Sequence, residues 1–184
     1  MRFGIEPQLA RGAAALPVGP QWCYGQKYDG FRAIAFVDGD QLVLQSRGSK
    51  DLTRYFPELT LPPGRYVLDG EIVIDGDGPG QAFGALQQRI HPAASRIERL
   101  ARELPASYVA FDLLELDGVE LLEEPFERRR AALDALEAAD HLVHCRRREL
   151  HRAGDVGAGH RQPGFVQPAE GFQVPAFGVG EIVR

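Results

Sequence analysis

Aspartate-glycine turns divide the first two-thirds of this chain and constrain its fold more than any other feature. The apolar-rich runs Phe31–Val37 and Gln41–Gln45 flank Asp38-Gly39-Asp40. Asp-Gly between two such runs predicts a β-hairpin, because both residues tolerate the backbone of a tight turn. Arg65–Asp75 indicates a buried strand that ends in a run of alternating aspartate and glycine. The chain therefore favours strands joined by short turns.

Further elements alternate with these strands. Phe83–Ile90 and Ser95–Leu104 carry apolar residues at helical spacing, and Tyr108–Leu116 predicts another strand. Pro125 stands at the start of an amphipathic helix over residues 126–140, a position that suits proline. We therefore predict an α+β fold with two packed, mainly antiparallel sheets flanked by helices.

The composition excludes several classes of protein. The chain has 184 residues and a formal net charge of −5, so overall positive charge cannot hold it on nucleic acid. It has no run of 18 or more apolar residues, so no membrane span is expected. We read no signal peptide at its start. Cys23 and Cys145 form no C-x-x-C pair, which argues against a zinc site and fits a reducing cytoplasm.

The string KYDGFR at residues 27–32 points to covalent chemistry on a lysine. The chain holds only two lysines, Lys27 and Lys50, against many arginines, so a lysine kept here indicates a need for a primary amine. Arginine cannot replace it, because a guanidinium stays protonated and is a poor nucleophile. The alternative for this string alone is a surface lysine before a hairpin turn.

Three later strings supply groups that a nucleotide site needs. SRGSKDLT places Arg47 after a strand, where its planar fork can hold a phosphate or ribose oxygen. LDGEIV places Asp69 and Glu71 two residues apart, on one face of a strand, where they can hold Mg²⁺ or a ribose hydroxyl. YVAFDLLEL offers Phe111 as an aromatic surface for a base, with Asp112 beside it. Taken singly, these strings also fit a solvated loop, a bulged strand and a core strand.

Together and in this order, the strings resemble the covalent nucleotidyltransferases, and specifically the adenylation domain of ATP-dependent DNA ligases. The resemblance covers roughly residues 5–140 and includes LTRYFPEL, ALQQRIHPAASR and ASYVAFDLLELDG, which are typical of bacterial ligases of end-joining and repair. It implies an ATP-grasp-like nucleotidyltransferase fold. It also implies a cytoplasmic, monomeric enzyme that acts on nicked or broken duplex DNA in repair and recombination.

The resemblance also implies roles for the first motif. Lys27 would be the nucleophile that forms lysyl-AMP from ATP, with Mg²⁺ or Mn²⁺ as the metal. Asp29 and Arg32 would complete the motif as nucleotide-binding residues, with Arg32 near the ribose. A lysine of ordinary pKa, about 10.4, must lose its proton to attack, and nearby cations and partial burial favour that loss.

The remaining implied site residues come from the later strings. Arg47 would contact the nucleotide or a DNA 5′-phosphate, and Glu71 would bind the ribose or a metal. Phe111 would stack on adenine. Glu170, in a Glu-Gly pair after Phe111, is a second candidate metal ligand.

The chain departs from the family pattern towards its C-terminal end. It has no lysine after Lys50, so the pair of lysines that grips the α-phosphate in the family is absent. Residues 1–142 are predicted to be a partial adenylation domain. We expect residues 143–184 to be a poorly ordered Gly/Pro/Arg-rich tail from a truncated or frameshifted reading frame, without an OB-fold. The rival interpretation is a genuine, shortened protein with a divergent tail.

Two other functions stay open on the sequence. One is a non-catalytic remnant that keeps a nucleotide pocket, which the missing lysine pair favours. The other is an RNA ligase or a capping guanylyltransferase of the same superfamily. The segments YFPEL and QQRIHPAASR argue against this second function. Whether the tail is a frameshift product or genuine, we expect this chain to be weak or inactive in sealing DNA.

Overall fold

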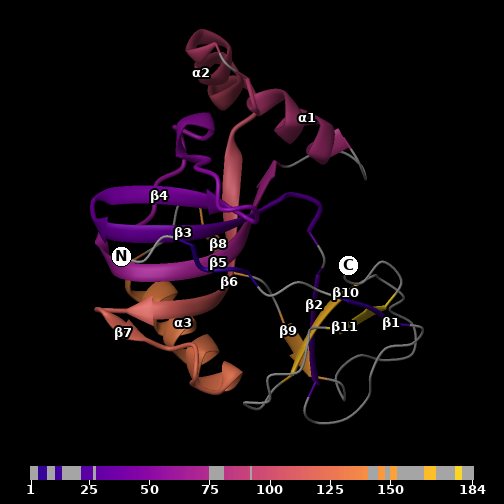
Figure 1. The fold of residues 1–184 in the computed structure, drawn as a ribbon, viewed down its shortest axis with the longest axis vertical. Coiled ribbons are helices and arrows are strands. Elements are labelled where there is room, and N and C mark those ends of the chain that lie inside the picture. Colours follow the sequence, from indigo (N-terminus) through magenta and orange to yellow (C-terminus); the bar gives the residue numbers. More distant parts are fainter. Residues whose placement is uncertain are drawn as a thin grey trace.

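The structure is a computed structural model, and it places two β-sheets and three α-helices in the part of the chain that it describes (Figure 1). None of the helices in that part is long and apolar enough to cross a membrane. The described residues are 4–7, 11–13, 22–26, 28–74, 81–91, 93–140, 145–147, 150–152, 164–168 and 177–179.

The larger sheet has the strand order β4-β3-β5-β6-β7, with β8 beside β6. All pairs are antiparallel except β6 with β8, which is parallel. The predicted hairpin is confirmed, since Gly39 adopts a φ of 60° in the turn between β3 and β4. The strands are β3 (Phe31–Gly39), β4 (Gln41–Ser46), β5 (Gly64–Ile74), β6 (Ala106–Leu116), β7 (Val119–Glu120) and β8 (Cys145–Arg147).

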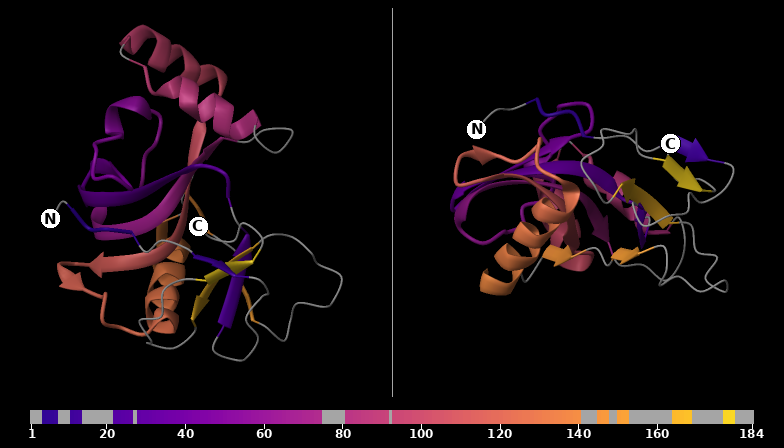
Figure 2. Two further views of the ribbon diagram at one scale, coloured as in Figure 1. Left: turned by 45° about the vertical axis from the view of Figure 1, so that its right-hand side comes forward. Right: turned by 90° about the horizontal axis from the view of Figure 1, so that it is seen from below.

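The smaller sheet has the order β1-β11-β10-β2-β9 and lies beside the larger one (Figure 2). Its β2 ends at Gln26, and β3 of the larger sheet starts at Phe31. Residues 27–30 therefore join the two sheets. The strands are β1 (Arg11–Ala13), β2 (Trp22–Gln26), β9 (Leu150–Arg152), β10 (Gly164–Pro168) and β11 (Phe177–Val179).

The main core lies on one face of the larger sheet. Helix α1 (Gln81–Arg89) contributes Leu86, and helix α3 (Phe126–Asp140) contributes Leu133; both side chains are fully buried. Burial of a leucine contributes about 1.5–3 kcal/mol, so these contacts fix both helices on the sheet. Helix α2 (Ala94–Glu103) lies with α1 at one end of the molecule, and α3 lies against β6 (Figure 2). The short helix η1 (Thr53–Tyr55) belongs to the loop that covers the same core.

The opposite face of the larger sheet is apolar at one end and charged at the other. Its apolar end is a second cluster built around Ile34 and Phe36, and Ile5 of the N-terminal segment packs on it. The buried amide of Gln45 holds this segment: it accepts a hydrogen bond from the Gly4 N–H at 2.7 Å and donates one to the Ile5 carbonyl at 2.8 Å. Side chains two residues apart on a strand share a face, so Arg32 lies on the face of Ile34.

The fold agrees with the prediction from sequence over residues 31–140. The two-sheet α+β architecture and the three helices are confirmed. The structure also has β8, β9, β10 and β11 from residue 145 onwards, where the sequence predicted no strand. The division of the chain at residue 142 and the nature of residues 143–184 stay predictions.

Candidate functional site

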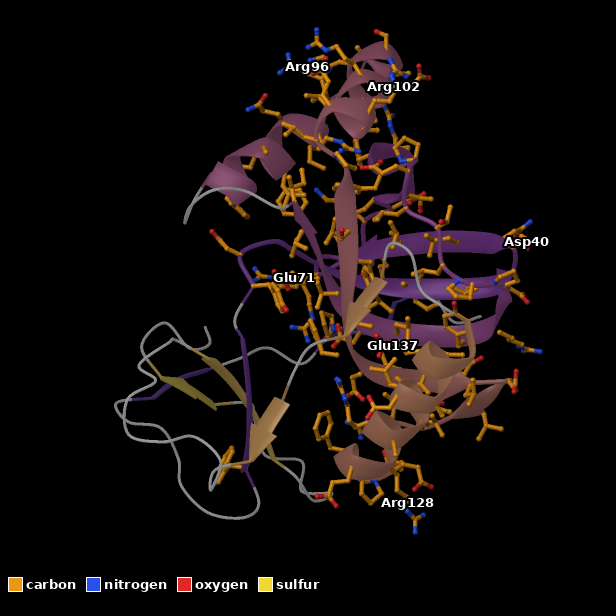
Figure 3. All side chains as sticks on the ribbon, turned by 180° about the vertical axis from the view of Figure 1, so that it is seen from behind. Asp40, Glu71, Arg96, Arg102, Arg128 and Glu137 are labelled. Atoms are coloured by element: carbon orange, nitrogen blue, oxygen red, sulfur yellow. The ribbon has the colours of Figure 1, made fainter. Side chains whose placement is uncertain are left out.

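Charged side chains gather on one face of β3, β5 and β6, near the passage from β2 to β3. Arg32 stands opposite Glu71 in the register of β3 and β5, and Ile34 stands opposite Asp69. Because Arg32 and Ile34 share a face, Asp69 and Glu71 share it too. Figure 3 shows the labelled Glu71 close to the point where the chain leaves the larger sheet towards β2. The sequence prediction that both carboxylates point to one face therefore agrees with this register.

Arg32 forms a two-pronged ion pair with Asp69. Its Nε and Nη2 donate to Oδ1 and Oδ2 of Asp69, each at 2.6 Å, and the two side chains are 16% and 7% exposed. Burial alone would lower the pKa of the Arg32 guanidinium, but the Asp69 and Glu71 carboxylates outweigh it and raise that pKa. The same guanidinium lies 4.3 Å from the centre of the Phe111 ring, which is 2% exposed. Arg32 is therefore fixed in plane and permanently charged.

Glu71 holds the loop that carries the lysine motif. Its Oε1 accepts a hydrogen bond from the backbone N–H of Gly30 at 3.1 Å. A Cβ on Gly30 would lie 2.2 Å from the Ile72 carbonyl oxygen and 2.7 Å from Glu71 Cγ, so only glycine fits this close approach. The loop is thus pressed onto β5 three residues after Lys27. Lys27 itself lies outside the described residues.

The other predicted site residues lie at different distances from this cluster. Asp29 is exposed in the loop before β3. Arg47 is exposed directly after β4, whose last residue Ser46 pairs with Ala33, the neighbour of Arg32. Arg47 and Arg32 are therefore at the same end of the sheet. Glu170 lies outside the described residues.

The described residues offer few ligands for a metal ion. Among them, no group of three or more histidine, cysteine, aspartate or glutamate side chains is placed to hold one. Asp69 is paired with Arg32. Glu71 is the carboxylate of the cluster that contacts the lysine loop, through the Gly30 N–H. Carboxylate donors suit Mg²⁺ or Mn²⁺, and a magnesium ion bound by one carboxylate together with substrate phosphates is a common arrangement.

Tyr108 and Gly70 support this cluster from the core side, and sequence reasoning did not assign them a role. The buried Tyr108 hydroxyl lies 2.9 Å from the Ala33 carbonyl and 3.1 Å from the Leu68 carbonyl, on the two strands that carry Arg32 and Asp69. A Cβ on Gly70 would lie 2.5 Å from the Tyr108 ring. The signal in the sequence is a glycine inside a buried strand, which marks a close approach.

A second buried ion pair lies next to the first, and sequence reasoning missed it as well. Nε and Nη2 of Arg129 on α3 donate to the two carboxylate oxygens of Asp112 on β6, at 2.9 and 2.8 Å. Burial raises the pKa of the Asp112 carboxyl, Arg129 opposes that rise, and the nearby Asp69 charge adds to it. Arg129 also donates to the Glu124 carbonyl at 2.6 Å, which ties α3 to the loop before it.

Comparison with known proteins places the chain among DNA ligases. Residues 8–155 match the family model described as the ATP dependent DNA ligase domain. DNA ligase C of Mycobacterium tuberculosis is 51% identical over 134 residues, which make up 70% of this chain and 37% of that protein. DNA ligase C1 of Mycolicibacterium smegmatis is 48% identical over 150 residues, or 77% of this chain and 42% of that protein. The chain spans about two-fifths of the length of these relatives.

Solved structures share the fold. A structure titled as mycobacterial DNA ligase D complexed with ATP and MES superposes with a TM-score of 0.66 at 23% identity, over 94% of this chain and 60% of that chain. The ATP complex of the bacteriophage T7 ATP-dependent DNA ligase superposes with a TM-score of 0.53 at 14% identity, over 93% of this chain and 68% of that chain. At these identities the likeness concerns the fold alone.

Proposed function

Because the chain belongs to the family of ATP-dependent DNA ligase domains, we propose that it reacts with ATP to form lysyl-AMP on Lys27. The observation that carries the proposal is the placement of KYDGFR. The motif bridges the two sheets between Gln26 and Phe31, and Glu71 fastens it to β5 through Gly30. The fastened loop leads directly into the strand of Arg32, and Arg47 lies at the same end of the sheet, so we propose that the nucleophile acts there.

In this reaction the Lys27 amine loses a proton and attacks the α-phosphorus of ATP. A nitrogen–phosphorus bond forms, the bond to the bridging oxygen breaks, and pyrophosphate leaves with the electron pair. The fixed positive charge of Arg32, and that of Arg47, would favour the neutral amine and offset the charge of the phosphates. A bound Mg²⁺ or Mn²⁺ would neutralise the triphosphate and activate the pyrophosphate as a leaving group. We propose Glu71 as the described residue that would help to hold this ion or the ribose.

The nucleoside is proposed to lie against Arg32 and Phe111. The pair with Asp69 holds the Arg32 guanidinium flat over the Phe111 ring, so the charge is presented in one orientation. Because Phe111 is 2% exposed, adenine stacking on it would require the groups that bury the ring to move aside. Asp29, exposed in the lysine loop, is proposed to complete the first motif. Glu170 stays a proposed second metal ligand.

Within a whole ligase, this step would supply the AMP that activates a DNA 5′-phosphate for sealing. We propose nicked or broken duplex DNA as the partner, in repair and recombination, with the protein acting as a cytoplasmic monomer. The 184-residue chain is expected to adenylate slowly and to seal poorly, because it has no lysine after Lys50 to stand near the α-phosphate. Loss of one preorganised contact of this kind commonly costs about 10²–10³ in rate.

Self-labelling tests the proposal. Incubation with ATP labelled at the α-phosphate and Mg²⁺ should leave label on the denatured protein, whereas ATP labelled at the γ-phosphate should not. Lys27→Ala and Lys27→Arg should both abolish the label, because arginine keeps the charge but supplies no nucleophilic amine. Lys50→Arg is the matched control and should keep it. Label that survives both Lys27 substitutions would show that another residue is the nucleophile.

The absence of lysine after Lys50 favours one alternative, a module that binds nucleotide without reacting. Such a protein would bind ATP in a filter or calorimetric assay and never acquire covalent label. A capping-type guanylyltransferase would take label from GTP rather than ATP. Parallel reactions with the two nucleotides therefore separate all three functions.

A further inference from the structure

Four buried charges form a row that joins α3 to the proposed nucleotide site. Arg32 on β3 pairs with Asp69 on β5, and Arg129 on α3 pairs with Asp112 on β6. Asp69 and Asp112 stand directly opposite each other in the register of β5 and β6. The side chains of both ion pairs are at most 16% exposed. The row therefore reads positive, negative, negative, positive, and its net charge is zero.

The middle of this row is unfavourable by itself. Like charges opposite each other on neighbouring strands repel, and burial removes the water that would screen them. Each carboxylate is stabilised by a two-pronged arginine, Asp69 by Arg32 and Asp112 by Arg129. A buried pair that loses one partner leaves an uncompensated charge, which is strongly destabilising. The balance at Asp69 thus depends on whether Asp112 is neutralised.

We propose that Arg129 is a positioning residue for nucleotide binding: by neutralising Asp112, it leaves the carboxylate of Asp69 and the guanidinium of Arg32 to each other. The inference rests on the proposed function, since it takes Arg32 as part of the nucleotide site. The effect of Arg129 on α3 passes through Asp112 on β6 and Asp69 on β5 to Arg32 on β3. Phe111, which lies under Arg32, directly precedes Asp112 in β6, so the same pair also holds this end of the ring's strand.

Removal of Arg129 predicts a pH-dependent defect. The charged groups that act on Asp112 are Arg129 from α3 and Asp69 from β5, with Arg32 from β3 on the far side of Asp69. Without Arg129, burial and Asp69 both push the pKa of Asp112 further up. At low pH the protonated Asp112 leaves the Arg32 pair intact. As the pH rises, Asp112 ionises, repels Asp69 and draws Arg32 out of its orientation.

The test is the KM for ATP in self-adenylation, measured from mildly acidic to mildly alkaline pH. Arg129→Met should raise KM by about 10- to 100-fold at the alkaline end, as is usual when a group that orients a binding residue is lost, and by much less at the acidic end. Arg129→Met with Asp112→Asn should restore a low KM at every pH, because the unpaired charge is gone. A KM for Arg129→Met equal to that of the unsubstituted protein, or a double variant as weak as the single one, would overturn the inference.

Arg128→Met is the matched control. Arg128 is the preceding residue of α3, its side chain is 77% exposed, and it pairs with Glu124 on the outside of the helix (Figure 3). The same substitution there should leave KM and its pH profile unchanged. A defect equal to that of Arg129→Met would show that any change in α3 weakens the site.

A second measurement needs no nucleotide and separates this inference from the proposed function. Urea unfolding of Arg32→Met, Arg129→Met and the double variant gives the coupling between the two residues at opposite ends of the row. The double variant should lose more stability than the sum of the single variants, because both carboxylates then lack a counter-ion. Additive losses, as for independent sites, would refute the row even if Lys27 labels normally. Coupling without any labelling would instead keep the row and refute the proposed function.

Discussion

Arg89 offers the most direct test of how this fold holds its two-helix end. The residue ends α1, is fully buried, and donates from Nη2 to both oxygens of Glu58 at 2.7 and 2.6 Å. It also donates to the carbonyls of Tyr55 at 3.0 Å and Leu104 at 3.2 Å. Glu58 in turn accepts the N–H of Ala106, the first residue of β6. One guanidinium thus ties η1, the ends of α1 and α2, and the start of β6 together.

Arg89→Met keeps much of the volume of the side chain and removes the hydrogen bonds that Arg89 donates. Breaking a buried ion pair on one side costs about 3–5 kcal/mol, because the remaining carboxylate is left without a counter-charge. For a chain of 184 residues, each kcal/mol lowers Tm by roughly 2–4 °C, which gives a fall of about 6–20 °C. The side chain of Glu58 is 14% exposed, so water can relieve part of the loss and favours the lower half of this range.

Thermal and urea unfolding followed by circular dichroism measure the effect. Arg99→Met is the matched control: it breaks an ion pair with Glu103 at 3.8 Å whose side chains are 60% and 58% exposed, and should cost at most about 0.5 kcal/mol. Within the described residues the Nε of Arg89 has no hydrogen-bond partner, so the buried cluster is not fully satisfied. Arg89→Met with Glu58→Met should therefore regain part of the loss, the remainder reflecting the Ala106 N–H that then lacks the Glu58 acceptor. A single-variant cost below about 1 kcal/mol, or no recovery in the double variant, would refute the reasoning.

Three further outcomes follow from the site. Gly30→Ala should destabilise the protein and suppress self-labelling, because its Cβ would lie 2.2 Å from the Ile72 carbonyl oxygen; unchanged labelling would show that the loop can move away from β5. Tyr108→Phe should cost about 1–3 kcal/mol in urea unfolding, because it removes the donor that faces two buried carbonyls, and a neutral result would assign those carbonyls to other partners. Asp112 has a pKa raised by burial, so its contribution to stability is fully present below its unfolded pKa of about 3.9 and is lost as pH rises through the folded value. The difference in unfolding free energy between the unsubstituted protein and Asp112→Asn should fall with rising pH, and a flat difference would contradict the raised pKa.

The strands and helices were predictable because their signals are local. Asp38-Gly39 between two apolar runs specifies the β3–β4 hairpin, and Gly39 adopts the positive φ that such a turn needs. Apolar residues at helical spacing, with Pro125 at the entry, likewise specify α3 within a residue. These patterns depend on neighbours a few positions apart, so they survive without knowledge of tertiary contacts. The strands after residue 145 have no such pattern in their text.

The sequence identified both Asp69 and Glu71, but it did not predict that Asp69 would pair with Arg32 and Glu71 would bind the Gly30 N–H. In sequence they are two carboxylates on one strand face, each able to bind a metal or a ribose. The register decides between them: Glu71 stands opposite Arg32, yet Arg32 reaches diagonally to Asp69, 37 positions away. Glu71 is thereby left to hold the N–H of Gly30. Only the pairing of β3 with β5 contains this information.

Arg129 shows a signal that was present in the sequence and passed over. Phe126, Arg129 and Leu133 recur at the i, i+3, i+7 spacing of a core-facing stripe, and both apolar members are buried. An arginine on such a stripe cannot snorkel to water as its exposed neighbour Arg128 does, so it requires a buried carboxylate. Asp112 lies among apolar residues in the sequence of β6, so it was the acid expected to be buried. An arginine and an acid at core-facing positions of adjacent elements therefore predict a buried ion pair. Hydrophobic periodicity alone would treat each of them as a mismatch to the amphipathic pattern.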